Sequence, residues 1–208
     1  MTIEELKQGN KSFRQTKFND YKNDFETLVE KGQTPNVLFI GCSDSRVVPD
    51  LILDSKPGDL FIVRNVGNFV PPFKADQDFH GNAAAIEYAV SVLNVEHIIV
   101  CGHSHCGACR SLYMDLENNI SLIHIKKWLQ LGKKAKDFVF ENYGTSIDEN
   151  QKYTLTEKSS IVFQLENLLS YPEVSKKIKN KKLKIHGWYY KIEDGSIEYY
   201  NFENKSFE

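Results

Sequence analysis

Three short apolar runs constrain the fold of this chain more than any other feature of its sequence. They cover residues 36–42, 60–63 and 97–101, and each is bounded by proline, glycine or a polar turn. Apolar runs of this length are typical of strands that are buried on both faces of a sheet. Between the second and third runs, residues 81–93 place apolar side chains at spacings of three and four, which predicts an amphipathic helix. The order strand, helix, strand therefore predicts a parallel sheet.

The rest of the sequence predicts helices around this sheet and a separate element at each end of the chain. Residues 1–33 are typical of two polar, amphipathic helical pieces, which would form an N-terminal helical arm. Residues 182–190 and 196–202 are β-like runs joined at Glu193-Asp194-Gly195, which predicts a C-terminal β-hairpin. The helices expected to flank the sheet cover residues 106–116, 122–131 and 159–169. The predicted fold class is α/β, with a central, mostly parallel β-sheet and flanking helices in a single domain over residues 1–208.

Composition and charge exclude several classes of protein. The 208 residues hold 26 lysines and arginines against 28 aspartates and glutamates, and a net charge of −2 gives no long-range attraction for nucleic acid. The six lysines in residues 176–184 lack interleaved aromatic residues and are more typical of a solvated helix end. No apolar stretch approaches the roughly 18 residues that cross a membrane, and residues 1–7 lack the apolar region of a signal peptide. We therefore expect a cytoplasmic protein with neither nucleic acid nor a membrane as a partner.

Side chains of the kinds that bind metals follow two of the three predicted strands. Residues 42–46 (Cys-Ser-Asp-Ser-Arg) follow the first strand, and residues 102–107 (Gly-His-Ser-His-Cys-Gly) follow the third. In open α/β sheets, sites form where the carboxyl ends of strands converge, and adjacent strands lie about 5 Å apart. If these two strands are neighbours, Cys42, His103 and Cys106 supply three ligands and leave a fourth position open, which is the pattern of catalytic zinc.

Other interpretations of the cysteines remain open at this point. A single buried cysteine is most often a small hydrophobic residue, and this applies to Cys42 taken alone. Residues 106–109 also match the C-x-x-C pattern of thiol-redox proteins, in which the motif opens a helix after a strand. That interpretation leaves His103 and the polar residues after the first strand without a role. Cys101, inside a strand, and Cys109, one turn into a helix, are expected to be packing residues.

A carboxylate and a guanidinium stand two positions apart in the first of these clusters. Asp44 and Arg46 are close enough in sequence to form an ion pair, which would keep the carboxylate ionised and in one orientation. Beside a metal, that carboxylate would accept a hydrogen bond from metal-bound hydroxide or would itself bind the metal. The alternative is an ordinary structural salt bridge, and the flanking Cys42 favours the functional role.

Five motifs together resemble those of the β-class carbonic anhydrases. They are Cys-Ser-Asp-Ser-Arg-Val at residues 42–47, Arg-Asn-Val at 64–66, Ala-Ala-Ile-Glu-Tyr-Ala-Val at 84–90, Gly-His-Ser-His-Cys-Gly at 102–107 and His-Gly-Trp at 186–188. The resemblance runs from about Leu6 to the predicted C-terminal hairpin. It implies a lyase with one zinc ion per subunit on the two cysteines and the histidine named above, with the aspartate–arginine pair beside it. The implied reaction is the reversible hydration of carbon dioxide to bicarbonate and a proton by metal-bound hydroxide.

The same resemblance implies which residues bind the substrate. Phe61, Val66 and Tyr88 would line an apolar pocket for carbon dioxide, and the backbone N–H of Gly107 would bind a substrate oxygen. Gln33 would donate a hydrogen bond to bicarbonate from across a dimer interface. The working unit would then be a homodimer or a multiple of dimers, with the N-terminal arm packed on the partner subunit.

Within the family, the chain resembles the plant-type branch through Gln33 and through Val-Pro-Pro-Phe at residues 70–73. The branch with a regulatory bicarbonate site typically has Trp three positions before the first cysteine ligand, where this chain has Phe39. Cys109 departs from the family, which more often has Met or Ile there. Two thiolate ligands donate more charge to zinc than imidazoles do, so we expect activity to rise with pH. The competing functions are a CS2 or COS hydrolase on the same fold and a non-catalytic zinc or thiol-redox module.

Overall fold

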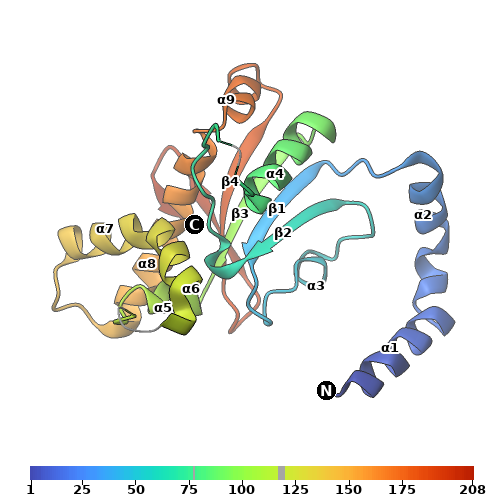
Figure 1. Ribbon diagram of the computed structural model, residues 1–208, viewed down its shortest axis with the longest axis horizontal. Coiled ribbons are helices and arrows are strands. Elements are labelled where there is room, and N and C mark those ends of the chain that lie inside the picture. The colour runs from blue at the N-terminus through green and yellow to red at the C-terminus, as the bar shows by residue number, and fades with distance from the viewer. Residues whose placement is uncertain (77, 117–119) are drawn as a thin grey trace.

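The described part of the chain is built around a six-stranded β-sheet (Figure 1). The computed structural model describes residues 1–76, 78–116 and 120–208. The strand order is β2-β1-β3-β4-β5-β6; the first four strands in this order are parallel, and β5 and β6 join in antiparallel fashion. The strands are β1 (Val37–Cys42), β2 (Leu60–Asn65), β3 (His97–His103), β4 (Lys184–Tyr190), β5 (Ile197–Asn201) and β6 (Ser206–Phe207).

Helices connect the strands and cover the sheet. Those of the body are α3 (Pro49–Leu53), α4 (Gly81–Glu87), α5 (Gly107–Ser111), α6 (Ile123–Leu129), α7 (Lys133–Tyr143), α8 (Glu149–Leu168) and α9 (Pro172–Lys179). The long helix α8 lies against β3 and β4, and its Ile161 and Leu165 are buried in the main hydrophobic core. The same core holds Leu38 and Ile40 of β1, because alternate side chains of a strand face the same side of the sheet. None of the described helices is long and apolar enough to span a membrane.

The predicted parallel sheet and C-terminal hairpin are confirmed, and the order of the strands explains where a site can form. β1 lies between β2 and β3. The chain therefore leaves β1 for β2 on one side and returns past β1 to β3 on the other. The carboxyl ends of β1 and β3 flank this reversal, which is the place where open α/β sheets bind ligands.

Several predicted helix boundaries are wrong. The helix expected over residues 106–116 ends at Ser111, and Lys136 Nζ donates to the carbonyl oxygen of Leu112 at 2.8 Å, a group that a longer helix would have used. The helix expected over 159–169 begins ten residues earlier, where the Asp148 side chain caps α8 by accepting the Gln151 N–H. The sequence predicted no bounds for helices α3, α7 and α9, although it indicated a helix end near the lysines of residues 176–184. Two of them, α3 and α9, begin with proline, which favours the first helical position as well as ending a preceding helix.

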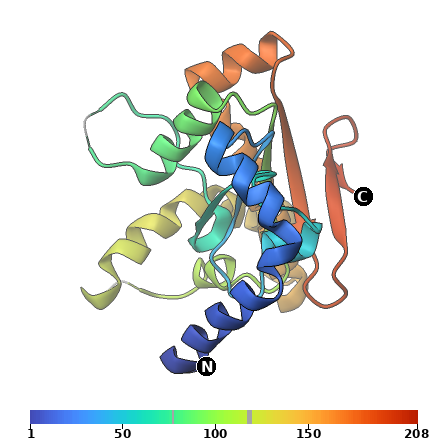
Figure 2. The same ribbon diagram turned by 90° about the vertical axis from the view of Figure 1, so that its right-hand side faces the viewer.

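The two N-terminal helices form an arm that extends away from the body of the subunit (Figures 1 and 2). α1 (Ile3–Gln15) begins with a capping box between Thr2 and Glu5, and α2 (Phe18–Lys31) follows it after two residues. Neither helix has a buried residue, although both have an apolar face. The aromatic rings on this face contact mainly one another: Phe18 lies between Phe13 and Phe25, with ring centroids 6.0 and 5.6 Å away. The arm thus carries apolar surface that the fold of one subunit does not bury.

Candidate metal centre

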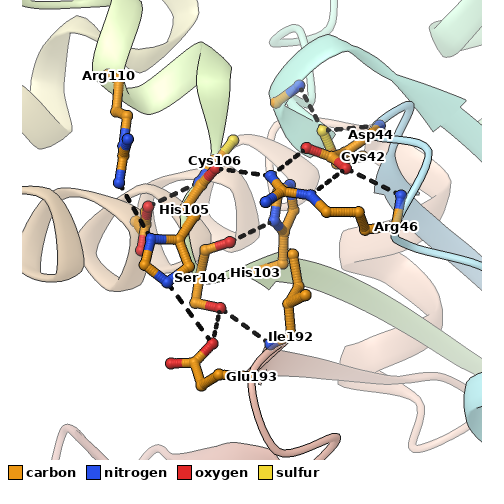
Figure 3. A network of polar contacts seen from close by, with 12 residues as sticks. Cys42, Asp44, Arg46, His103, Ser104, His105, Cys106, Arg110, Ile192 and Glu193 are labelled. Carbon is orange, nitrogen blue, oxygen red and sulfur yellow. Dashed lines mark hydrogen bonds and ion pairs between the residues drawn. The ribbon is translucent and has the colours of Figure 1, made fainter.

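Three side chains with metal-binding atoms meet at the carboxyl ends of β1 and β3 (Figure 3). Cys42 is the last residue of β1, His103 is the last residue of β3, and Cys106 precedes the first residue of α5. Their two sulfur atoms and one ring nitrogen lie within 4.8 Å of one another, and all three residues are buried. The condition set by the sequence, that the first and third strands be neighbours, is met by the pairing of β1 with β3.

The hydrogen bond made by His103 decides which of its ring nitrogens is free. Nδ1 lies 2.8 Å from the carbonyl oxygen of Ser104. Because a carbonyl oxygen can only accept, Nδ1 carries the proton and Nε2 keeps its lone pair. Nε2 is buried and has no hydrogen-bond partner among the residues that the structure describes. A buried lone pair without a partner, beside two thiols, is the arrangement expected of a metal-ligating histidine.

The two thiols need a positive charge beside them in order to ionise. The neighbouring Cys106 thiol and burial together raise the pKa of Cys42 to about 12. The pKa of Cys106 is raised too, first by the adjacent Cys109 thiol and also by burial. Zinc is a divalent cation that prefers thiolate and imidazole ligands, and with three protein ligands it retains an open coordination position. The donor set of Cys42, His103 and Cys106 therefore fits zinc.

Backbone N–H groups hold the sulfur atom of Cys42. The N–H groups of Asp44 and Gly67 each point to Cys42 Sγ, with N to S distances of 3.4 Å. Gly67 has φ +82°, and a Cβ there would come within 2.8 Å of a side chain of α5, so the position requires glycine. Asn65 closes the loop by accepting from the N–H of Phe69 at 2.8 Å and donating to its carbonyl oxygen at 2.9 Å. Sequence reasoning did not assign Asn65 or Gly67, although Asn65 stands in a quoted motif.

Asp44 and Arg46 form a two-point ion pair beside these three side chains (Figure 3). Arg46 Nε donates to Asp44 Oδ1 at 2.9 Å, and Nη2 donates to Oδ2 at 2.8 Å. These hydrogen bonds hold the pKa of the Asp44 carboxyl well below its usual range. Arg64 supports the same loop, since its Nε donates to the carbonyl oxygen of Cys42 at 3.0 Å and its Nη2 to that of Asp44 at 2.7 Å. The carboxylate is therefore both ionised and fixed in orientation.

Two of the expected substrate-binding residues lie at the carboxyl ends of the parallel strands, where the candidate metal ligands meet; we call this the metal-binding end of the sheet. Val66 directly follows β2, whose last residue pairs with Cys42 in the sheet register. Its side chain is 42% exposed. Gly107 begins α5, where backbone N–H groups have no partner within the helix. Val66 thus follows the residue that pairs with Cys42 across the sheet, and Gly107 directly follows Cys106 along the chain.

The other expected substrate-binding residues do not reach the metal-binding residues of the same subunit. Phe61 and Tyr88 contact each other, with ring centroids 5.8 Å apart. Phe61 lies four residues before the last residue of β2, which at about 3.3 Å per residue is about 13 Å from the metal-binding end. Gln33 is exposed between α2 and β1. Within one subunit, these three residues therefore lie toward the opposite end of the strands from Cys42, His103 and Cys106.

The two remaining cysteines are buried free thiols outside the group of three. Cys101 lies in β3 and contributes to a small cluster with Phe39 and Ile99. Cys109 lies in α5 and packs among apolar residues that include Phe69. These surroundings are those of the packing residues that the sequence predicted.

A chain of polar contacts ties the end of β3 to the β4–β5 turn (Figure 3). Ser104 Oγ donates to Glu193 Oε2 at 2.5 Å and accepts from the N–H of Ile192 at 2.9 Å. His105 lies between two charged groups, 3.0 Å from Arg110 Nη2 and 3.9 Å from Glu193 Oε2. These contacts hold the backbone next to His103. Sequence reasoning missed them because the residues of the turn are almost 90 positions away.

A buried carboxylate from α8 also reaches this centre. Glu157 is 3% exposed, and its Oε1 accepts from the backbone N–H of Cys106 at 2.8 Å. Its Oε2 accepts from the hydroxyl of Tyr189 at 2.8 Å. Burial raises the pKa of Glu157 to about 7. No local sequence pattern signals this contact, since Glu157 stands 51 positions after Cys106.

Comparisons with known proteins match this chain to carbonic anhydrases. Residues 37–197 match a family model described as carbonic anhydrase. A carbonic anhydrase of Helicobacter pylori is 38% identical over 202 residues, which cover 96% of this chain and 91% of that protein. A carbonic anhydrase of Synechococcus elongatus is 40% identical over 198 residues, which cover 94% of this chain and 70% of that protein. The solved β-carbonic anhydrase CcaA matches 99% of this chain and 91% of its own, with a TM-score of 0.92 and 38% identity. One of two tetrameric β-carbonic anhydrases of Sordaria macrospora has a TM-score of 0.83, 29% identity and 95% coverage of both chains.

Proposed function

Because this chain belongs to the β-class carbonic anhydrases, we propose that Cys42, His103 and Cys106 hold the zinc ion of that family's reaction, one ion per subunit. The chain is an enzyme that reversibly hydrates carbon dioxide to bicarbonate and a proton. The observation that carries the ligand assignment is the imidazole Nε2, buried beside two thiols and without a hydrogen-bond partner among the described residues.

Asp44 is proposed to orient the attacking water. When bound, zinc supplies a Lewis acid that lets water act as a nucleophile near neutral pH, an effect for which carbonic anhydrase with three histidine ligands is the standard example. The Asp44 carboxylate accepts a hydrogen bond from that water and so turns a lone pair toward the substrate. Arg46 keeps the carboxylate ionised and fixed through its two-point contact, and its positive charge offsets the negative groups nearby.

Val66 and Gly107 are proposed to contact the substrate within the subunit. Carbon dioxide is apolar, so the side chain of Val66 provides a surface that excludes water from it. The product carries negative charge on its oxygens, and the N–H of Gly107, at the start of α5, donates to one of them. The apolar contact favours binding of carbon dioxide, and the N–H donor stabilises the negative charge that develops on an oxygen during the reaction.

We place Gln33, Phe61 and Tyr88 in a site that a second subunit completes. Within one subunit Phe61 lies about 13 Å from the metal-binding end of the sheet. Tyr88 is 43% exposed, and Gln33 stands exposed at the end of an arm whose apolar face is not buried. Packing of residues 1–33 on a partner would cover that face and carry Gln33 to the partner's centre. The working unit is then a homodimer or a multiple of dimers.

The variant Gln33→Ala tests this arrangement. Loss of a hydrogen bond to a charged substrate is expected to lower kcat/KM about tenfold, while zinc content and dimer mass stay unchanged. The matched control is Gln8→Ala, since Gln8 is an exposed glutamine of the same arm. Stopped-flow hydration kinetics and light scattering provide the measurements. Equal kinetics for the native protein and Gln33→Ala would remove Gln33 from the site, and a monomeric native protein would remove the interface.

Direct measurement of turnover and metal content tests the proposed function as a whole. The native protein is expected to hold one zinc ion per chain and to hydrate carbon dioxide in a stopped-flow assay, with far slower hydrolysis of COS and CS2. Full zinc content without carbon dioxide hydration would favour a non-catalytic zinc module instead.

We infer the plant-type branch and a cytoplasmic location from separate observations. Phe39, where the other branch typically has Trp, is buried within β1, and residues 70–73 carry the Val-Pro-Pro-Phe motif. All four cysteines are buried free thiols, which suits a reducing compartment such as the cytoplasm.

A further inference from the structure

The peptide unit that joins His105 to Cys106 is held from both sides by charged residues. On one side, Arg46 Nη2 donates to the carbonyl oxygen of His105 at 3.1 Å. On the other side, the N–H of Cys106 donates to Glu157 Oε1 at 2.8 Å. Arg46 comes from the loop after β1 and Glu157 from α8, so two segments far apart in sequence fix one peptide plane next to a metal-binding sulfur atom.

This peptide unit needs such support because of the backbone around it. His105 has φ +57°, a left-handed conformation that is strained for a residue with a side chain. Cys106 stands at the N-cap of α5, where no side-chain hydrogen bond from the cap residue is present. Glu157 satisfies the N–H of this cap residue, as the glutamate of a capping box does, but it comes from another helix.

The carboxyl group of Glu157 is buried in the core, and both of its oxygens accept hydrogen bonds there. It is one of the few charged residues buried in the described chain, and it is 3% exposed. Burying a carboxyl group without partners is costly, and here both oxygens are satisfied, Oε1 by Cys106 and Oε2 by the Tyr189 hydroxyl. A leucine or methionine of similar volume would fill the space without that cost, so packing alone does not explain a glutamate here.

The two cysteine ligands are held in different ways. Cys42 Sγ accepts two backbone N–H groups, from Asp44 and Gly67. Cys106 instead has its own N–H fixed by Glu157, so its sulfur is oriented through the backbone. The next peptide carries the Gly107 N–H assigned to the substrate. The single hydrogen bond from Cys106 to Glu157 of α8 thus orients the backbone of both Cys106 and the following Gly107 N–H.

We propose that Glu157 is a positioning residue of the zinc centre. By accepting from the backbone N–H of Cys106, it fixes the orientation of Cys106 Sγ and of the Gly107 N–H, while Arg46 binds the carbonyl oxygen on the opposite side of the same peptide unit. The proposal rests on the zinc assignment made above. Residues around a metal ligand commonly change metal affinity about 10- to 100-fold when they are altered.

Three substitutions separate the parts of this role. Glu157→Gln keeps an acceptor oxygen for the Cys106 N–H and a group that can pair with Tyr189. Glu157→Asp keeps the charge but withdraws the oxygen by one methylene. Tyr189→Phe is the matched control, because it removes the contact to Oε2 and leaves the contact to Cys106 intact.

The measurements are zinc release to a chromogenic chelator and the thiolate-to-metal absorption band of the cobalt-substituted protein. Glu157→Asp is expected to release zinc about 10- to 100-fold faster and to shift the cobalt band. Glu157→Gln and Tyr189→Phe are expected to stay close to the native protein in both. A merely structural role would lower the melting temperature of all three variants without moving the cobalt band.

Two outcomes overturn the proposal or its premise, and they differ. If folded Glu157→Asp and a second folded variant, Glu157→Met, both release zinc at the native rate and keep the native cobalt band, Glu157 has no positioning role. If the native protein binds no zinc, or if Cys106→Ser still binds it fully, the ligand assignment fails and the positioning proposal fails with it.

Discussion

Cys106→Ser is expected to lose stoichiometric zinc and with it carbon dioxide hydration. A serine hydroxyl is not ionised near neutral pH, whereas zinc requires a thiolate from this position to balance its charge. Even changes around a metal ligand cost about 10- to 100-fold in affinity or activity, so loss of the ligand itself should cost more than about 100-fold in kcat/KM. Metal analysis of the purified variant and stopped-flow kinetics provide the two readouts.

Cys109→Ser is the matched control for that experiment. Cys109 is also a buried thiol of the α5 region and adjoins Cys106, but it lies outside the group of three potential ligands. The control should keep its zinc and most of its activity. Full zinc and native turnover in Cys106→Ser would contradict the ligand assignment. Loss of zinc from both variants alike would show that Cys109 also takes part in the centre.

Asp44→Asn is expected to lower kcat/KM by about 100-fold or more with zinc retained. An amide cannot accept from both Nε and Nη2 of Arg46 and carries no charge, so both the orientation and the electrostatic effect of the carboxylate are lost. Loosening of Arg46 would also release the carbonyl oxygen of His105. Zinc content separates loss of the metal from loss of the orienting carboxylate.

The pH dependence of this variant follows from the depressed pKa of Asp44. A carboxyl group whose pKa is lowered in the folded state contributes stability above its ordinary pKa, near 4, and that stability is lost as the pH falls through the folded value. Asp44 is therefore ionised throughout the range of about pH 7 to 9, and the expected rise of native activity with pH must come from another group. The ratio of native to Asp44→Asn rates should stay constant over that range. Native rates in Asp44→Asn at both ends of the range would contradict the role of Asp44.

The sheet was predictable because its signal is local. Strands buried on both faces appear as apolar runs between turn residues, and the helix of residues 81–93 shows its apolar face through spacing alone. Helix ends were less predictable. Pro172, just beyond the expected end of the helix over residues 159–169, begins α9, because proline favours the first helical position as well as a helix end. The early start of α8 depends on a cap at Asp148 that lies outside the clearly apolar part of the helix.

The meeting of the three candidate ligand residues was predictable for the same reason, whereas the contacts that hold them in place were not. Cys42, His103 and Cys106 stand at strand ends, and the pairing of β1 with β3 brings them together. Three supporting contacts join segments 25, 51 and 89 residues apart: the Gly67 N–H to Cys42 Sγ, the Cys106 N–H to Glu157, and Ser104 to Glu193. Neither periodicity nor a motif carries information about such pairs.

The sequence by itself determined the class of sheet, the three candidate metal-binding residues and the carboxylate–guanidinium pair, because each depends on residue type and short spacing. Only the tertiary structure decided which ring nitrogen of His103 is free, that Glu157 reaches Cys106, and that Phe61 lies about 13 Å from the metal end of its own subunit. The physical reason is that orientation and satisfaction of buried polar groups depend on contacts between distant segments, and these exist only once the core has formed.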